Sequence, residues 1–469
     1  MTKKPNIILI TIDSLRACHL GFMGYKKNIS PNLDRLAEES TVFTQAYVVG
    51  PNSSHSFPSI LTSTYPLDYQ ALHIDENREL LSEVLKKQGY LTACLQTSPF
   101  LSGYFGYNRG WDYFEDIAVP VPKSKFFNPY SFRGRLQDIL IKLSINSSPH
   151  IFFGLLYLRN KIKNLFKETK PYKTGAPFIN KIIKDFIGAN KDGEKPFFLW
   201  AHYQDVHGPF IPYDCRYQER PLTYLELIGR NLPTLIANYP SKNKSFKKFA
   251  RKHIGKTIEF YNDGIKYFDE QFGDLLNFIE KENIGQETIL CITSDHGDEL
   301  LEHGGVGHYD SKLYNEILHV PLLLKIPGQM GKRIEEKVSL IDLAPTLCDL
   351  AGVKKPASYK GKNLFEDKED FIFHQASFSG KKDFWQTIKP GKLDNCAIAC
   401  QSGEWKYILD YSSRKEELYN LREEEGEQNN LIKIKPEIAI QMKEKLSKFL
   451  EDNPPFSLTK GNHNEIYEK

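Results

Sequence analysis

The sequence contains no long apolar run, no closely spaced cysteine pair and no large excess of one charge. No stretch approaches 18 uninterrupted apolar residues, so no membrane-spanning helix is expected. The first apolar run, Ile7–Ile12, is too short for the core of a secretory signal and is not followed by a cleavage site. We therefore expect the protein in the cytoplasm.

Cysteine usage and charge exclude two further classes of protein. The seven cysteines are odd in number and scattered, which indicates reduced, mostly buried thiols rather than a disulfide framework. The net charge is only +3 across 469 residues, which argues against a nucleic-acid-binding protein. The hydrophobic content of 40% is sufficient for a sizeable core.

Short buried strands that alternate with helices dominate the first three quarters of the chain. Asn6–Ile12 and Thr288–Ile292 are near-continuous aliphatic runs, typical of strands buried on both faces of a parallel sheet. Further strands are expected at Thr41–Val49, Tyr90–Gln96, Pro196–Ala201 and Val320–Lys325, and helices from Ser30-Pro31 and at Glu79–Lys87, Ala176–Ile187, Phe260–Glu280 and Leu340–Ala351. This alternation predicts an α/β fold with a mostly parallel central sheet and helices on both faces.

The pattern changes after about residue 370. Phe371–Ala376, Asn395–Cys400 and Trp405–Asp410 are typical of strands in a small antiparallel sheet, and Pro436–Leu450 of an amphipathic terminal helix. We therefore divide the chain into an α/β domain, residues 1–369, and a small C-terminal α+β subdomain, residues 370–469.

Two basic segments interrupt this pattern. Residues 123–170 contain ten Lys or Arg against two acidic residues, together with apolar clusters. This insertion either packs an amphipathic hairpin on the body of the protein or forms a lid or membrane-surface element. A second basic run, Lys242–Lys256, also favours an anionic partner.

Three predicted strands end in groups that could bind a metal. These groups are Asp13, then His202, Asp205 and His207, and then Asp295 and His296. Because the carboxyl ends of parallel strands meet at one edge of a sheet, we expect them to lie together. An Asp and a His side by side at such an end can hold a metal, although Asp-His-Gly also suits a turn.

A hydroxyl-rich loop, Asn52-Ser53-Ser54-His55-Ser56, opens a predicted helix. Helix N-termini favour anions through their free N–H groups and the helix dipole. A serine placed there beside a divalent metal can be ionised and attack an ester, whereas the alternative is a simple helix cap.

The motifs of the chain resemble those of the sulfatase family, part of the alkaline phosphatase superfamily. The similarity begins with Pro5-Asn6-Ile7-Ile8-Leu9-Ile10-Thr11-Ile12-Asp13 and continues through Ser30-Pro31-Asn32-Leu33, Asp205-Val206-His207-Gly208-Pro209, Ser294-Asp295-His296-Gly297, Glu302-His303-Gly304 and Leu313-Tyr314-Asn315-Glu316. Glu404-Trp405-Lys406-Tyr407 resembles the small terminal subdomain of the family. The resemblance covers nearly the whole chain in the right order.

The resemblance implies roles for individual residues. Asp13, Asp295 and His296 match metal ligands, and Ser53 stands at the position of the nucleophile, where its oxygen completes the metal site. The catalytic residues predicted in this way are Ser53, His207 and His308, with His202, Ser54 and Lys312 as substrate-binding residues. Ser54 is also a reserve nucleophile, and Asp205 with His207 is a candidate pair for a second metal.

The chain departs from the family at the nucleophile. Members with sulfatase activity carry Cys-x-Pro-x-Arg, whose cysteine becomes formylglycine, and these three positions are Ser53, His55 and Phe57 here. The second Asp of the usual opening pair is Ser14. An unmodified serine would form a sulfo-ester without the exit that formylglycine provides, whereas a phosphoserine can be hydrolysed at phosphorus.

The sequence therefore predicts a metal-dependent hydrolase of sulfate or phosphate esters. The substrate is expected to be a small or a glycan- or lipid-linked anionic ester, and nucleic acid is not an expected partner. One divalent ion is expected, Mn²⁺, Zn²⁺, Mg²⁺ or Ca²⁺, and the imidazole ligand disfavours the last two. The alternatives are a phospho-headgroup transferase that contacts a membrane surface peripherally through residues 123–170, and a binding protein that keeps the fold without turnover.

Overall fold

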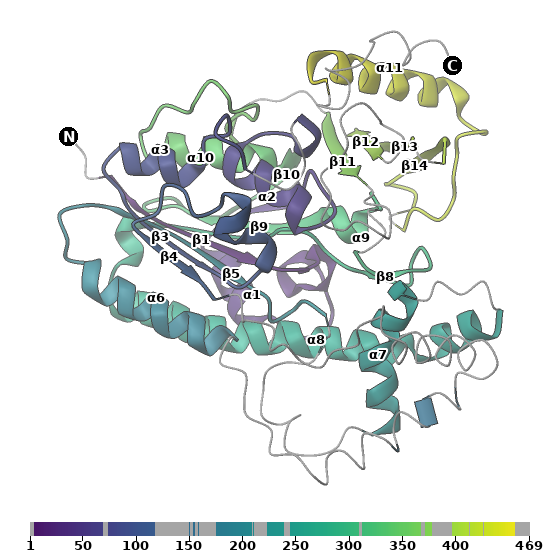
Figure 1. Cartoon of the computed structure of the whole chain (residues 1–469), viewed down its shortest axis with the longest axis horizontal. Coiled ribbons are helices and arrows are strands. Elements are labelled where there is room, and N and C mark those ends of the chain that lie inside the picture. The colour runs from purple at the N-terminus through teal and green to yellow at the C-terminus, as the bar shows by residue number, and fades with distance from the viewer. Residues whose placement is uncertain are drawn as a thin grey trace.

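A large mixed sheet forms the centre of the molecule. The computed structural model describes residues 4–68, 74–117, 150, 153–154, 158, 175–208, 210, 223–238, 244–308, 312–366, 371–377, 396–411, 413–424 and 426–454. The sheet consists of β1 (Asn6–Ile12), β2 (Thr41–Tyr47), β3 (Leu91–Gln96), β4 (Tyr113–Asp116), β5 (Phe197–Tyr203), β6 (Thr288–Ser294), β9 (His319–Lys325) and β10 (Lys332–Ser339). Its eight strands lie in the order β10-β2-β9-β6-β1-β5-β3-β4, and Figure 1 shows the sheet between two layers of helices.

The predicted α/β fold is confirmed. Every pairing in this sheet is parallel except those of β9, which runs antiparallel to β2 and β6. Helices α2 (Ser53–Thr62), α3 (Leu81–Lys87) and α10 (Leu343–Leu350) cover one face, and α1 (Pro31–Glu38), α6 (Ala176–Asn190) and α8 (Lys244–Lys281) cover the other (Figure 1).

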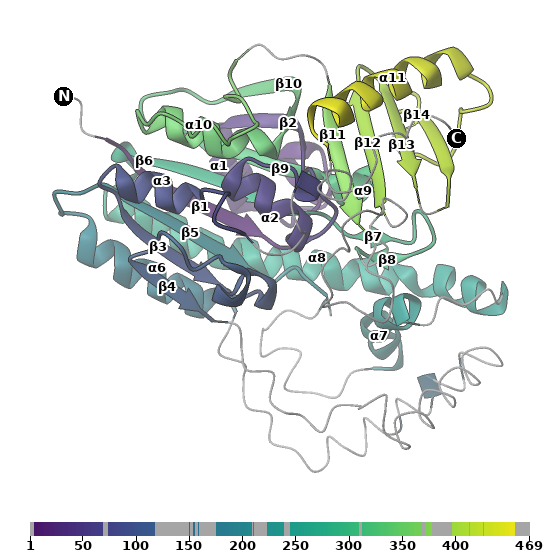
Figure 2. The ribbon, with the colours of Figure 1, turned by 45° about the horizontal axis from the view of Figure 1, so that its top comes forward.

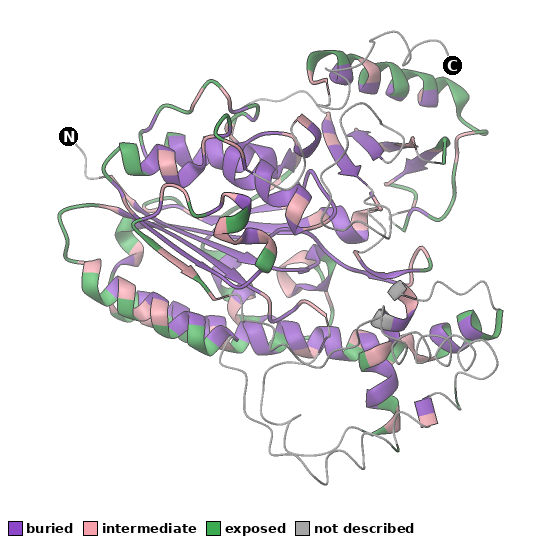
Figure 3. Ribbon diagram, in the orientation of Figure 1, coloured by how far each residue is buried: buried purple, intermediate pink, exposed green. Residues whose placement is uncertain are grey.

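Strand β1 shows why a continuous aliphatic run becomes the central strand. Successive side chains of a strand point to opposite faces, so Ile7 and Leu9 pack in one hydrophobic cluster and Ile8 and Ile10 in the other. All seven residues of β1 are buried, as are those of its neighbours β5 and β6. Figure 3 shows the same burial across the sheet.

A second, four-stranded sheet follows near the C-terminus. It consists of the antiparallel strands β11 (Ile372–Ser377), β12 (Cys396–Ser402), β13 (Trp405–Asp410) and β14 (Lys415–Asn420), and α11 (Pro436–Asp452) packs on it (Figure 2). The predicted small sheet and terminal helix are therefore present. The predicted division between residues 369 and 370 falls outside the described residues and stays a prediction.

Several elements differ from the sequence prediction. Helix α8 begins at Lys244 rather than at residue 260, because Phe246 and Phe249 extend its apolar face against α7 (Tyr224–Asn238). Strands β4, β10 and β14 were not predicted. β4 and β10 are edge strands and β14 begins with Lys-Glu-Glu, so none has a buried aliphatic run.

The basic insertion at residues 123–170 lies outside the described residues apart from positions 150, 153, 154 and 158. Its predicted roles as a lid or membrane-surface element therefore stay predictions. In the described part of the chain, no helix is both long and apolar enough to cross a membrane. The six described cysteines are free and all but Cys18 are buried, as expected.

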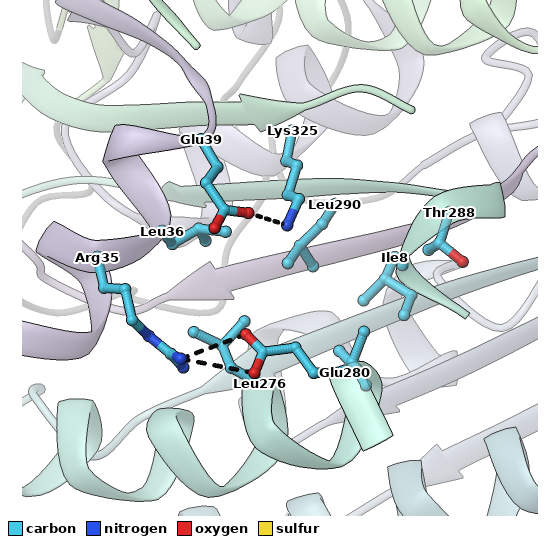
Figure 4. Close-up of a pocket in the computed structure, with 11 residues that line it drawn as sticks. Ile8, Arg35, Leu36, Glu39, Leu276, Glu280, Thr288, Leu290 and Lys325 are labelled. Atoms are coloured by element: carbon cyan, nitrogen blue, oxygen red, sulfur yellow. Dashed lines mark hydrogen bonds and ion pairs between the residues drawn. The ribbon is translucent and has the colours of Figure 1, made fainter. Parts of the chain in front are cut away.

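A small cavity of about 40 Å³ lies at the amino ends of the central strands (Figure 4). Ile8 and Thr288 line it, and the ion pairs Arg35–Glu280 and Lys325–Glu39 stand at its mouth. This end is opposite the carboxyl edge where the predicted site residues follow β1, β5 and β6. The cavity is therefore separate from the candidate site.

A buried ion pair in the C-terminal part of the chain connects the small sheet to helix α9 (Asn315–Leu318). The Lys406 ammonium on β13 lies 2.8 Å from Glu427 and donates to the Asn315 side-chain oxygen at 3.0 Å, and both charged side chains are fully buried. Burial lowers the pKa of Lys406 and raises the pKa of Glu427, and their contact opposes both shifts. Asn315 begins α9 of the main domain, and its amide donates to Glu427 at 2.6 Å.

Lys406→Ala is expected to lower the free energy of unfolding by about 3–5 kcal/mol, because it leaves the Glu427 carboxylate buried without its cation. Urea denaturation measures this change. Lys181→Ala is the control: its pair with Asp185 is exposed, so the expected loss is below about 1 kcal/mol. Equal losses in the two variants would contradict the prediction.

Candidate active site

The carboxyl ends of β1 and β6 are joined by side-chain and backbone hydrogen bonds. The Ser294 hydroxyl donates to the Ile12 carbonyl oxygen at 2.6 Å and accepts from the Leu15 amide at 3.0 Å. On the other side of β1, the Asp13 amide donates to the Tyr203 carbonyl at the end of β5. These bonds fix Asp13 and Asp295 as neighbours, as the strand pattern predicted.

Asp13, Asp295 and His296 form a buried group that can hold a metal ion. Their ligand atoms lie within 4.8 Å of one another, and His296 Nε2 is 3.5 Å from a carboxylate oxygen of each Asp. His296 Nδ1 lies 2.9 Å from the Gly297 carbonyl oxygen, and donation to that oxygen leaves Nε2 as a lone-pair donor. Burial lowers the pKa of His296, which favours the neutral, metal-binding form of the ring.

The electrostatics of the two carboxylates fit a cation. Burial, together with the nearby Asp13, raises the pKa of Asp295 to about 7. Burial acts the same way on Asp13, but the imidazoles of His207, His202 and His296 keep the pKa of Asp13 well below its usual value. Among the described residues, Asp295 Oδ2 has no hydrogen-bond donor. Two buried carboxylates without a Lys or Arg partner in the described chain are a suitable environment for a divalent ion.

Ser53 is the first residue of α2 and faces this metal-binding group. Its Oγ lies 3.4 Å from His296 Nε2, and the residue is 7% exposed. The preceding Asn52 caps the helix by accepting from the His55 amide at 3.2 Å. Ser54 turns the other way, since its hydroxyl donates to the Asn52 side-chain oxygen at 2.7 Å. Of the two candidate nucleophiles, only Ser53 therefore lies beside the metal-binding group.

His207 and His308 lie on the more open side of the group. The His308 ring centroid is 4.1 Å from that of His296 and 5.3 Å from that of His207, and both His207 and His308 are partly exposed. His308 Nδ1 lies 2.7 Å from the buried Asp298 carboxylate, which orients the ring. Asp298 was not predicted, although its position directly after Asp295-His296-Gly297 is the signal that could have identified it.

Two of the predicted substrate-binding residues, His202 and Lys312, contact other side chains of the protein. His202 is fully buried behind Asp13, with Nε2 3.5 Å from its carboxylate and Nδ1 2.9 Å from the Thr11 hydroxyl. Lys312 forms an ion pair with Glu299 at 2.6 Å and donates to the His303 carbonyl oxygen. His202 is thus fully buried beside Asp13 and Lys312 is paired with Glu299, and their predicted roles in substrate binding stay predictions.

The suggested second metal pair, Asp205 with His207, stays a prediction. The Asp205 carboxylate is buried and accepts the Ala176 amide at the start of α6, at 3.0 Å. Burial raises the pKa of Asp205 to about 6. In the described residues Asp205 belongs to no group of three or more side chains that could hold a metal.

The positions where the chain departs from the family motifs have structural roles. Ser14 adopts a left-handed conformation, with φ of 63°, and its hydroxyl donates to Asp13 at 3.0 Å. Gln204, which was not predicted, donates to the other Asp13 oxygen at 3.2 Å. Phe57 is fully buried and packs edge-on against His202, with ring centroids 4.9 Å apart. An apolar ring therefore fills the position where the family motif has Arg.

Comparisons with known proteins agree with this geometry. The family profile described as Sulfatase matches residues 5–353, and the profile of the N-sulphoglucosamine sulphohydrolase C-terminal region matches residues 304–452. The chain is 26% identical to arylsulfatase K of Bos taurus, across 94% of this chain and 81% of that protein. It is 24% identical to a delta 4,5-hexuronate-2-O-sulfatase of Bacteroides thetaiotaomicron, across 92% of this chain and 85% of that protein.

Solved structures show the same fold. The crystal structure of the phosphonate monoester hydrolase of Agrobacterium radiobacter superposes with a TM-score of 0.68 at 17% identity, covering 98% of both chains. The profile match covers most of the chain and includes all the strands that carry the candidate site. The protein therefore belongs to the sulfatase family of sulfuric ester hydrolases, within the alkaline phosphatase superfamily, as its motifs predicted.

Proposed function

We propose that the protein is a metal-dependent hydrolase of phosphate or sulfate monoesters in which unmodified Ser53 is the nucleophile. The observation that carries this proposal is the position of Ser53 Oγ, at the N-terminus of α2 and 3.4 Å from His296 Nε2. A nucleophilic hydroxyl needs an activating group within reach and a partner for the anionic oxygens of its target. The start of α2 and the Asp13, Asp295 and His296 group supply both.

The metal would be held by Asp13, Asp295, His296 and the Ser53 oxygen. When bound, a divalent ion acts as a Lewis acid and lowers the pKa of a hydroxyl beside it. The imidazole among these donors favours Mn²⁺ or Zn²⁺ over Mg²⁺ or Ca²⁺. His202, Gln204 and Ser14 all contact Asp13, so we assign them the positioning of that carboxylate.

The reaction proceeds in two displacements. Ser53 Oγ, after loss of its proton to solvent, forms a bond to phosphorus or sulfur while the bond to the ester oxygen breaks, and the departing alkoxide takes a proton from His308 or His207. The imidazoles, which lie on the open side, also face the equatorial oxygens of the substrate. In the second displacement water gives a proton to the same imidazole as it attacks phosphorus or sulfur, and the bond to Ser53 Oγ breaks and releases the serine oxygen. Asp298 keeps the His308 ring in orientation for both steps.

Phosphate is the favoured substrate group of the two. A phosphoserine is hydrolysed by attack of water at phosphorus, whereas an unmodified serine sulfo-ester lacks the exit that a formylglycine hydrate provides. The position that carries an anion-binding Arg in the family motif is occupied here by the buried Phe57. The described site therefore lacks that guanidinium. The relatives include both sulfatases and a phosphonate monoester hydrolase, which supports testing both ester types.

Ser53→Ala is expected to lower kcat for an aryl phosphate about 10³-fold or more, because in the described residues Ser53 has the hydroxyl that lies within hydrogen-bond distance of His296 Nε2. Stopped assays with aryl phosphate and aryl sulfate measure this loss. Mass spectrometry of the peptide around Ser53 after rapid quenching should show added phosphate.

Ser54→Ala is the matched control, since its hydroxyl contacts Asn52 and His55 rather than the metal-binding group, and its kcat should stay within about threefold of wild type. Unchanged turnover in Ser53→Ala, or formylglycine at position 53, would contradict the assignment of an unmodified Ser53 as nucleophile. A metal-loaded protein without turnover of any ester would contradict the hydrolase proposal.

Chelation is expected to abolish turnover and to lower the melting temperature, because two buried carboxylates then lack a cation. Re-addition of Mn²⁺ or Zn²⁺ should restore both better than Ca²⁺ does. Metal content by plasma mass spectrometry and differential scanning fluorimetry measure the two effects.

The Asp295→Asn variant distinguishes the loss of metal binding from a loss of stability of the metal-free protein in the same melting experiment. The variant should lose metal, yet its metal-free form should melt no lower than metal-free wild type, because one of two neighbouring buried carboxylates has been neutralised. A metal-free variant that melts well below metal-free wild type would show that Asp295 contributes structurally without the ion.

A further inference from the structure

We propose that the N-terminal part of α8 is an exosite for an anionic polysaccharide, which would carry the ester that the site hydrolyses. This inference rests on the proposed function and extends it to the substrate class. Five exposed cations lie on successive turns of this part of α8, and we call them the basic stripe: Lys244, Lys247, Lys248, Arg251 and Lys252.

The spacing of the basic stripe places its charges on one side of the helix. Residues three and four positions apart are neighbours on a helix surface, and the stripe extends about 12 Å along the axis at about 1.5 Å per residue. Residues 244–256 contain no Asp or Glu. Within the described chain, none of the five cations forms an ion pair, and the nearest pair on the helix is Lys256–Glu259.

This arrangement is unfavourable without a partner. Like charges three or four residues apart repel one another. Cations in the first turns of a helix also face the positive end of the dipole. A chain of closely spaced anions relieves both effects at once, and such a ligand would bind more weakly as salt concentration rises.

The apolar residues of this part of α8 lie on the face opposite the basic stripe, where they pack against α7 and hold the helix in place. Phe246, Phe249 and Ala250 are buried against Ile228, Leu232 and Leu235 of α7. Because Phe246 and Phe249 are buried, their rings offer no stacking platform for nucleic-acid bases. It also presents no apolar face for insertion into a bilayer. Charge alone remains for recognition, which suits a sulfated or otherwise anionic polysaccharide.

Helix packing connects the basic stripe to the part of the molecule that carries the candidate active site. Helix α7 contacts β8 (Val306–Gly307), the strand that directly precedes His308 (Figures 1 and 2). Leu301, in the turn between β7 (Glu299–Leu300) and β8, packs against the same hydrophobic cluster as Phe246 and Phe249. A polymer bound along α8 would thus lie on the helical pair that flanks the candidate site.

The test uses the full-length protein with fluorescein-labelled heparin as the probe, in anisotropy titrations at low and at physiological salt. The variant K247Q/K248Q/R251Q/K252Q is expected to bind heparin about tenfold more weakly or worse. The control K433Q/K435Q/K445Q/K448Q removes the same charge from exposed positions in and near α11 and should change the Kd less than about threefold. Thermal melting confirms that both variants are folded.

Three results would overturn the exosite proposal. These are equal heparin Kd values for wild type and the α8 variant, equal losses of affinity in the α8 and α11 variants, and no heparin binding by wild type. A loss confined to phosphatidylglycerol vesicles or to single-stranded DNA would overturn it as well. Turnover of a small aryl phosphate should be unchanged in the α8 variant, because that substrate does not reach the stripe. If wild type hydrolyses no ester but the selective heparin effect holds, the hydrolase proposal fails and the exosite stands.

Discussion

The parallel pairing of β1 with β5 and β6 is the constraint on which the rest of the site depends. It brings Asp13, Gln204 and Asp295 to one edge of the sheet, although they are far apart in the sequence. Ser294 then links the ends of β1 and β6 through the Ile12 carbonyl and the Leu15 amide. The backbone of both aspartates is held by buried strand ends, and the side chains of His202, Gln204 and Ser14 contact the Asp13 carboxylate.

That rigidity has an electrostatic cost that shapes the surroundings. Two buried carboxylates repel one another, and the imidazoles of His202, His207 and His296 around Asp13 partly offset this repulsion. A divalent ion held by the proposed ligands would offset the remainder. Phe57 packs on His202 and excludes water from behind the site, so the polar groups act in a low-dielectric environment, where charge interactions are strong.

The hairpin that carries Asp298 and His308 is supported from two sides. On one side Leu301 packs in the cluster formed by α7 and α8. On the other, the His303 ring stacks on Tyr314, contacts Glu316 at 2.6 Å and lies 2.9 Å from the Glu427 carbonyl oxygen of the C-terminal segment. Burial opposes protonation of His303, but its Glu316 contact raises the pKa of the ring overall. The C-terminal segment thus helps to hold the hairpin that carries His308, the residue we propose as an acid in the reaction.

The sequence by itself determined the fold class, most buried strands and the meeting of Asp13, Asp295 and His296 at one edge of the sheet. Aliphatic runs such as Asn6–Ile12 form strands in almost any context, and the residues directly after such strands meet at the carboxyl edge of a parallel sheet. The edge strands β4 and β10 escaped prediction because solvent exposure removes the aliphatic signal.

Only the tertiary structure decided the roles of groups whose neighbours come from elsewhere in the chain. His202 and Lys312 carry the right chemistry for substrate binding, yet burial beside Asp13 and pairing with Glu299 commit them to other partners. The choice between Ser53 and Ser54 likewise rests on which hydroxyl turns toward His296. Residue type fixes the chemistry available to a side chain, whereas its burial and its partners, which are set by long-range packing, fix the role that it takes.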